Sequence, residues 1–261
     1  MTAPLLVEDA GAVRVLTLHR PEARNALSGE LISALYRELL ALDADDGVHA
    51  AVLTGSDPAF CAGVDLKEAA RDGAAYFARF DTENCVGQAA LVRTPLIGAV
   101  NGAAFTGGLE LALGCDFLIA SERAVFADTH VGVGVLPGGG MTVRLPQRVG
   151  PAAARRMSMT GEVVDAVRAE RLGLVTEVVP HDQLRDRALA LAERVAEVPP
   201  AAMAGLKAQY AAGERAALGA AFAAETELAN RWQADPGRAD LRGLEERRRA
   251  VRSRNREQLG S

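Results

Sequence analysis

The most informative part of the chain is a glycine-containing turn, Asn101-Gly102-Ala103-Ala104-Phe105-Thr106-Gly107-Gly108-Leu109-Glu110. It follows an apolar run at residues 96–100 that is typical of a buried β-strand, and it leads into an apolar helical pattern. Gly107 and Gly108 stand where that helix begins, and the first backbone N–H groups of a helix have no partner within it. Because glycine lets a ligand approach the backbone closely, this turn predicts a site for an anion or a developing oxyanion.

A second turn of the same kind, Phe60-Cys61-Ala62-Gly63-Val64-Asp65-Leu66, follows an earlier apolar run at residues 50–55. Neither turn fits the phosphate-binding pattern GxxxxGK[ST], and neither gives GxGxxG with an acidic residue at the required distance. The chain also lacks a GxSxG elbow and an HExxH metal motif. The two turns therefore favour an oxyanion site over a nucleotide site, and we expect no metal.

The pattern along the chain alternates between strands and helices. Short apolar runs predict strands at residues 13–18, 50–55, 96–100 and 117–120. A helix is predicted to begin after Ser28, because leucines and isoleucine recur there at helical spacing. This alternation predicts an α/β core with buried, mostly parallel strands over residues 1–182. Residues 183–261 read as helical throughout, with breaks at 199–200 and 235–237.

Composition excludes several classes of protein. The 261 residues are 49% hydrophobic with a net charge of −5, so the chain is neither disordered nor a general nucleic-acid binder. Its three cysteines have no CxxC spacing, which argues against disulfides and zinc ribbons. The most apolar stretch is interrupted by Asn101, Glu110 and Asp116, so we expect no membrane span. No leader pattern is visible at the first residues, and we expect a cytoplasmic protein with free thiols.

The sequence resembles the crotonase superfamily, the enoyl-CoA hydratase/isomerase family, over nearly its whole length. The segment from Arg20 to Leu27 resembles the family's R-P-x-x-x-N-A-L opening, and Phe60 to Leu66 resembles its F-x-A-G-x-D-L turn. The stretch from Asn101 to Asp116 resembles N-G-x-x-x-G-G-x-E-L-A followed by C-D, and Thr160 to Pro180 resembles the T-G, G-L-V and P segment.

This resemblance implies a spiral of repeated ββα units followed by C-terminal helices used for trimerisation. It implies a coenzyme A thioester as substrate and no further cofactor, because coenzyme A is part of that substrate. The activity implied first is that of an enoyl-CoA hydratase in fatty-acid or related acyl-CoA metabolism. A homotrimer, or two stacked trimers, is the assembly implied, with no nucleic-acid or membrane partner.

The resemblance also assigns roles to residues of this chain. The backbone N–H groups of Val64 and Gly107 are implied to form the oxyanion hole, and Glu110 is implied to be catalytic. Taken without the resemblance, Glu110 is better explained as an acid that complements the positive end of its helix. The residues implied to contact the substrate, including its coenzyme A part, are Ala23, Arg24, Ala62, Asp65, Leu66, Arg247 and Arg248.

One departure from the family pattern matters most. Where hydratases carry a second glutamate, after Phe126-Ala127-Asp128-Thr129, this chain has His130. Histidine exchanges protons near neutral pH, but it differs from glutamate in geometry and charge. We therefore expect His130 to assist Glu110 and keep three alternatives open: isomerisation, another crotonase-type thioester reaction, and binding of acyl-CoA without catalysis. Asp128 reaches the site only if the local backbone permits.

Several further features allow two interpretations each. Met141 stands where the family has glycine and either fills volume or narrows the acyl pocket. Tyr76, Phe77 and Phe80 either line that pocket or pack in the core. The arginine-rich end of the chain is either a solvated helix face or a phosphate contact. The apolar residues after position 183 either cover the chain's own core or join copies of it.

Overall fold

The computed structural model describes residues 3–235 and 243–259. Its larger sheet has six strands in the order β1-β2-β3-β5-β7-β10. The strands are β1 (Leu5–Ala10), β2 (Val13–Leu18), β3 (Ala50–Gly55), β5 (Leu96–Val100), β7 (Phe117–Ser121) and β10 (Glu177–Val179). The β1–β2 pair is antiparallel, and every other neighbouring pair in this sheet is parallel.

A smaller sheet lies beside the first, in the order β4-β6-β8-β9. Its strands are β4 (Ala59–Cys61), β6 (Ala103–Phe105), β8 (Val125–Ala127) and β9 (Val164–Asp165). The chain places β3, β5 and β7 in the large sheet and sends the strand after each of them into the small one. Each turn of the chain thus gives one strand to each sheet, which is the spiral of ββα units expected from the family.

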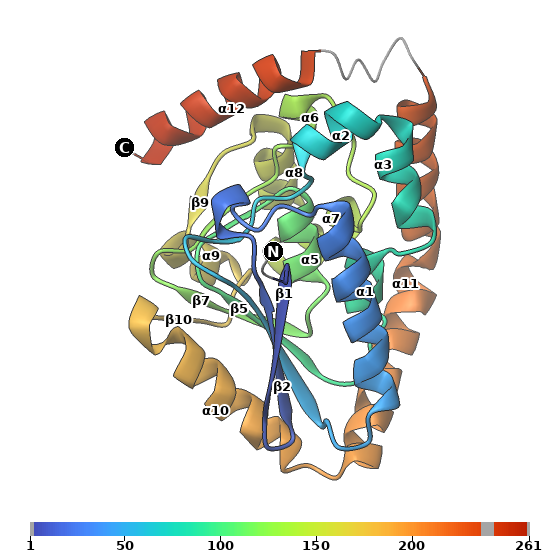
Figure 1. Cartoon of the computed structure of the whole chain (residues 1–261), viewed down its shortest axis with the longest axis vertical. Helices are drawn as coiled ribbons and strands as arrows, with labels where there is room; N and C mark the ends of the chain where they lie inside the picture. The colour runs from blue at the N-terminus through green and yellow to red at the C-terminus, as the bar shows by residue number, and fades with distance from the viewer. Residues whose placement is uncertain (1–2, 236–242, 260–261) are drawn as a thin grey trace.

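Helices fill the outside of this spiral (Figure 1). Helix α1 (Gly29–Ala44) begins as predicted after Ser28, whose Oγ accepts from the Leu31 N–H at 3.2 Å, and its leucines are buried. The helices that follow are α2 (Leu66–Asp72), α3 (Ala74–Ala78), α4 (Cys85–Ala89), α5 (Gly107–Leu113), α6 (His130–Val133), α7 (Met141–Val149), α8 (Pro151–Thr160) and α9 (Ala166–Leu172). Short 3₁₀ turns span Pro21–Ala23, Arg79–Asp81 and His181–Gln183.

The C-terminal part is helical, as expected: α10 (Leu184–Ala196), α11 (Pro200–Ala234) and α12 (Leu244–Leu259). Helix α10 packs on the large sheet through Leu184, Ala188 and Ala192, so this helix covers the chain's own core. Helix α11 is 35 residues long and runs along the opposite side of the molecule (Figure 1). Helix α12 lies across α6 and α2.

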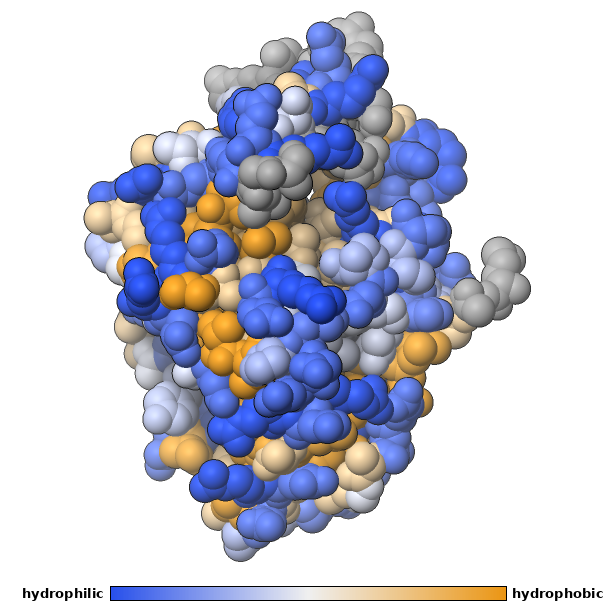
Figure 2. Space-filling view, turned by 90° about the vertical axis from the view of Figure 1, so that its left-hand side faces the viewer, coloured by the Kyte–Doolittle hydropathy of each residue, from blue (hydrophilic) through white to orange (hydrophobic). Residues whose placement is uncertain are grey.

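The core holds the three cysteines. Cys61, Cys85 and Cys115 are buried and unbridged, and burial raises the pKa of each thiol to about 12, which keeps it protonated. Within the described residues, no helix has the length and apolar content needed to cross a bilayer. The face that carries α10 is mostly hydrophilic, with hydrophobic residues in separate patches (Figure 2).

Candidate active site

The two glycine turns meet at one edge of the small sheet. Strands β4 and β6 are parallel neighbours, so the turns that follow them lie side by side. Gly63 has a φ of +88°, and a Cβ there would lie 1.9 Å from Thr106 Oγ1 and 3.2 Å from the Gly107 nitrogen. Only glycine fits this contact, because any larger residue pushes the two turns apart.

Two backbone N–H groups are left free where the turns touch. Among the described residues, neither the Val64 nor the Gly107 N–H has a hydrogen-bond partner. A Cβ built on Gly107 would lie 3.9 Å from the Val64 nitrogen, so the two donors are neighbours. A pair of adjacent donors held by backbone geometry is what stabilises negative charge on a carbonyl oxygen. The predicted oxyanion pair is therefore brought together by the fold.

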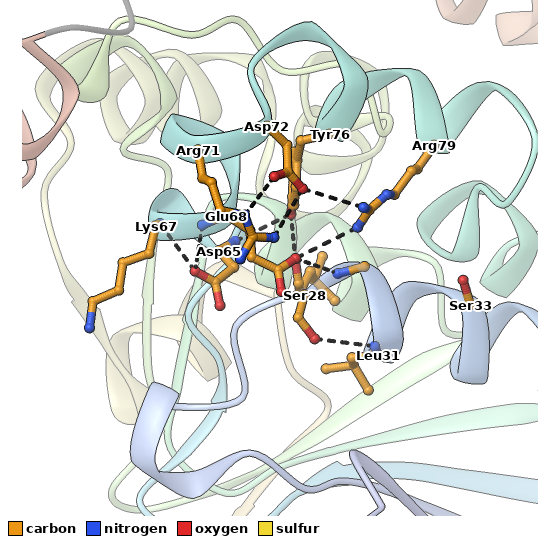
Figure 3. A network of polar contacts seen from close by, with 12 residues as sticks. Ser28, Leu31, Ser33, Asp65, Lys67, Glu68, Arg71, Asp72, Tyr76 and Arg79 are labelled. Atoms are coloured by element: carbon orange, nitrogen blue, oxygen red, sulfur yellow. Dashed lines mark hydrogen bonds and ion pairs between the residues drawn. The ribbon is translucent and has the colours of Figure 1, made fainter.

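The Val64 turn is held by contacts on its far side. Leu27 pairs with Val64 in a short parallel bridge, and the Leu27 N–H donates to the Gly63 carbonyl at 2.8 Å. The Tyr76 hydroxyl donates to the Leu27 carbonyl, and the Asp65 N–H donates to that hydroxyl at 3.3 Å (Figure 3). Tyr76 is fully buried and burial raises its pKa, so it is a core residue and a support of the turn.

Asp65 uses its side chain to begin α2 (Figure 3). Its Oδ1 accepts from the Lys67 and Glu68 N–H groups at 3.1 and 3.3 Å, and its Oδ2 accepts from Arg20 Nη1 at 3.0 Å. Leu66 packs against a small valine cluster under α12. The side chain of Asp65 is therefore occupied by a helix cap and an ion pair, and a substrate contact from these two residues stays a prediction.

The backbone of residues 23–26 lies against the same turn. The Ala62 N–H donates to the Arg24 carbonyl at 3.0 Å, and the Ala26 N–H donates to the Ala23 carbonyl at 3.2 Å. Arg24 and Asn25 both have φ above +50°, and Asn25 Nδ2 holds this bend by donating to the Ala59 carbonyl at 2.6 Å. The structure thus groups Ala23, Arg24 and Ala62, and their coenzyme A contact stays a prediction.

Glu110 projects from the first turn of α5 and is almost fully buried. Its Oε1 accepts from the Gly139 N–H at 2.8 Å and from the Met141 N–H at 3.3 Å. Burial raises the pKa of Glu110 above its usual value, against the opposing effect of the nearby His130. A buried carboxyl group with a raised pKa is suited to exchanging a proton with a substrate.

His130, at the start of α6, bridges two carboxyl groups. Its Nε2 lies 3.6 Å from Glu110 Oε2, and its Nδ1 lies 2.7 Å from Asp128 Oδ1. The His130 N–H also donates to Asp128 Oδ1, at 3.2 Å, so the local backbone does turn Asp128 toward the site. The structure therefore places the predicted pair Glu110 and His130 together and adds Asp128 behind the imidazole.

The charges of these three groups depend on each other. Burial alone would lower the pKa of His130, but the Glu110 and Asp128 carboxyl groups outweigh it and raise that pKa. Burial alone would raise the pKa of Asp128, but its hydrogen bonds with His130 prevail and lower it. The two carboxyl groups therefore favour the charged form of His130, and a Glu110 of raised pKa faces its other nitrogen.

Sequence reasoning missed Glu225, which lies near the site, and left two interpretations of Met141. Glu225, on α11, is buried and accepts hydrogen bonds from the Gly140 and Thr142 N–H groups at 2.6 and 2.7 Å. Nothing in the alanine-rich sequence of α11 distinguishes it from other glutamates there. Met141 is fully buried in the main core, so it fills volume.

Arg247 and Arg248, the two α12 arginines implied to contact the substrate, are the last of the predicted site residues. Arg247 Nε donates to the Val133 carbonyl at 3.0 Å, which ties α12 to the end of α6. The side chain of Arg248 lies outside the described part of the structure. A phosphate contact from either residue stays a prediction. Across the described residues, no cluster of histidine, cysteine and acidic side chains is arranged to hold a metal ion.

Comparisons with known proteins agree with this geometry. The model of a family described as enoyl-CoA hydratase/isomerase matches residues 8–250. A probable enoyl-CoA hydratase of Rhizobium meliloti is 46% identical over 202 residues, which cover 76% of this chain and 78% of the relative.

Two solved structures from Mycobacterium smegmatis share the fold. An enoyl-CoA hydratase matches with a TM-score of 0.80 at 46% identity, covering 88% of this chain and 98% of that one. A monofunctional enoyl-CoA isomerase matches with a TM-score of 0.71 at 31% identity, covering 81% of this chain and 94% of that one. Sequence and fold therefore agree that this chain is an enzyme of the enoyl-CoA hydratase/isomerase family.

Proposed function

We propose that this enzyme adds water to 2-enoyl-CoA thioesters. The observation that carries the proposal is the buried Glu110 carboxyl group facing His130 Nε2 at 3.6 Å, beside two free backbone donors. An oxygen atom can lie at a hydrogen-bonding distance of about 2.8 Å from both groups at once. That is the position of a water molecule oriented by one acceptor and one donor.

The two free donors stabilise the charge that hydration develops. As the water oxygen bonds to C3 of the substrate, the C2–C3 π electrons move toward the thioester carbonyl and form an enolate. The Val64 and Gly107 N–H groups donate to that enolate oxygen, and they bind it more strongly than the neutral carbonyl. Their contribution is therefore to the transition state more than to substrate binding.

The protons balance within the site. Glu110 accepts a proton from the attacking water and returns it to C2, which collapses the enolate to the 3-hydroxyacyl thioester and leaves Glu110 ionised again. His130 Nε2–H donates to the water or to Glu110 and holds the Glu110 charge while it carries no proton. Asp128 accepts from His130 Nδ1–H, so the other nitrogen is directed toward the reacting atoms.

Isomerisation of the substrate double bond is the second candidate. It is favoured by one observation, the imidazole of His130 at the position where family hydratases carry a second glutamate. Moving a double bond needs one base that takes a proton from one carbon and returns it to another, and Glu110 alone suffices for that. No water has to be activated.

One experiment separates the candidates. The protein is incubated in deuterated water with a short 2-enoyl-CoA, and separately with a 3-enoyl-CoA, and the products are read by mass spectrometry. Hydration gives a 3-hydroxyacyl-CoA with deuterium bound at C2. Isomerisation converts the 3-enoyl substrate without adding water. Binding without any turnover or exchange of carbon-bound hydrogen refutes both activities and leaves an acyl-CoA-binding protein.

We extend the proposal to assembly and setting. A homotrimer, or two stacked trimers, is supported by exposed apolar residues along α11, where Leu206, Tyr210 and Leu228 are 48%, 74% and 58% exposed. Light scattering tests this, since a trimer has about three times the chain mass of 27.4 kDa. The enzyme is proposed to act in the cytoplasm, in fatty-acid or related acyl-CoA metabolism, with no cofactor besides the coenzyme A of its substrate.

A further inference from the structure

A loop at the start of α7 donates alternate N–H groups to two different carboxyl groups. Gly139 and Met141 donate to Glu110 Oε1 at 2.8 and 3.3 Å. Gly140 and Thr142 donate to Glu225, at 2.6 Å to Oε1 and 2.7 Å to Oε2. Successive N–H groups thus point in opposite directions, so the loop lies between the proposed catalytic carboxyl group and a carboxyl group of α11.

Glu225 is well held in this place. Only 7% of the residue is exposed, and the Thr142 hydroxyl donates to Oε2 in addition to the two N–H groups. A buried carboxyl group is tolerated when it accepts several hydrogen bonds, and here the donors are the free N–H groups at the beginning of α7. Removing the carboxyl group leaves buried backbone donors without a partner.

A second contact joins α11 to the same loop, through the Phe222 ring and Arg144. Arg144 Nη1 donates to the Gly139 carbonyl at 2.8 Å, and the Arg144 guanidinium lies 4.7 Å from the centre of the Phe222 ring. Phe222 stands three residues before Glu225 on α11, so both side chains project from one side of the helix. The residues that orient Glu110 are therefore anchored from α11 at two points.

We propose that Glu225 is a positioning residue, which fixes the Gly139–Met141 backbone and through it the direction of the Glu110 carboxyl group. This inference rests on the proposed function only in taking Glu110 as the group that transfers the proton. The position of Glu110 then depends on α11, a helix whose apolar residues the sequence assigns either to the chain's own core or to contacts between copies.

The charge of Glu225 also affects the pKa of Glu110. The ionisable groups that face Glu110 are His130 on α6, Asp128 before it, Arg144 on α7 and Glu225 on α11. The negative charge of Glu225 is one of the causes that raise the pKa of Glu110. Replacing Glu225 by a neutral residue therefore lowers the pKa of Glu110, and activity that depends on ionised Glu110 extends to lower pH.

The test compares Glu225→Gln with Glu227→Gln, the same change two residues along α11, where the side chain is 60% exposed and pairs with Arg231. Glutamine keeps the length of Glu225 but offers one acceptor oxygen in place of two. We expect Glu225→Gln to lower kcat by about ten- to a hundredfold, as a misplacement of the order of 1 Å does, with KM nearly unchanged. Its acidic pH limit is expected to move down, and Glu227→Gln is expected to match the unmodified enzyme.

A second variant and a measurement that needs no substrate complete the test. Thr142→Val removes only the hydroxyl group that donates to Glu225, and it serves if Glu225→Gln fails to fold. We expect it to lower kcat in the same way, but by less. The pKa of Glu110, followed by NMR of ¹³C-labelled glutamate and assigned with Glu110→Gln, needs no substrate. If the unmodified protein has no turnover, the proposed function is refuted, while a lowered Glu110 pKa in Glu225→Gln still supports the contact between Glu225 and the Glu110 site. Unchanged kcat and unchanged Glu110 pKa in Glu225→Gln overturn the positioning role.

Discussion

Replacing Gly139 by alanine tests the geometry of the site most directly. A Cβ at this position would lie 2.8 Å from Glu110 Oε2, 2.9 Å from Glu110 Cδ and 2.7 Å from Val86 Cγ1. Ordinary contact begins at 3.4 Å, so the Glu110 oxygen must retreat by about 0.6 Å. A shift of 1 Å costs on the order of a hundredfold in rate, so we expect kcat to fall about tenfold or more.

Stability should change far less than activity in this variant. Crowding against Val86 costs about 1–3 kcal/mol, and the reduced freedom of the unfolded chain returns about 0.4–1 kcal/mol. For a chain of this size each kcal/mol moves Tm by about 2–4 °C, so Gly139→Ala stays folded at the assay temperature. The assay is turnover of a short 2-enoyl-CoA at 25 °C, with Tm measured on the same sample.

Gly138→Ala is the matched control. Its Cβ would meet only Ala229 Cβ, at 3.3 Å, and it does not face Glu110. We expect this variant to keep kcat within a factor of about two, because no hydrogen bond to the carboxyl group is disturbed. Full activity in Gly139→Ala, or an equal loss in both variants, would refute the view that the Gly139 backbone sets the position of Glu110.

Three further outcomes follow from the charges of the site. Glu110→Gln keeps shape without the titrating group, so turnover should fall by about 10²–10⁴, measured in the same assay. His130→Glu places a third carboxyl group between two buried ones, so turnover and Tm should both fall; a rise in hydration would contradict this. The pKa of Asp128 is lower in the folded protein than its unfolded value near 3.8. The ionised carboxyl group therefore stabilises the fold above pH 3.8, and this stabilisation is lost as the pH falls through the folded pKa. Acid unfolding, followed by circular dichroism, should depend less steeply on pH in Asp128→Asn. In the same variant the pKa of His130 should fall, and the alkaline limit of activity should move to lower pH.

The fold was predictable from sequence where elements are long or wholly buried. The strands at residues 13–18, 50–55 and 96–100 agree with the structure residue for residue, and Ser28 marks the start of α1. Strand β1 was not predicted from the sequence, because it is an antiparallel edge strand whose residues after Leu5 are mostly exposed. The strands of the small sheet have two or three residues each, which is too short for any periodicity to appear.

The candidate site was predictable to the extent that its chemistry lies in local motifs. The glycines of both turns are visible in the sequence because backbone geometry demands them, as the 1.9 Å contact at Gly63 shows. The contact between Gly140 and Glu225 joins residues 85 positions apart. Such a contact depends on where α11 crosses the loop, and a uniform alanine-rich helix carries no sign of it.

The distribution of partners explains which carboxyl group can exchange a proton. Three carboxyl groups are buried here, and each is compensated differently. Asp128 has the imidazole of His130 at 2.7 Å, and Glu225 has two N–H groups and a hydroxyl at the start of α7. Glu110 has two N–H groups on one oxygen, while its other oxygen lies 3.6 Å from His130, beyond a direct hydrogen bond. Burial raises the pKa of Glu110, and its second oxygen is the one left to meet a substrate proton.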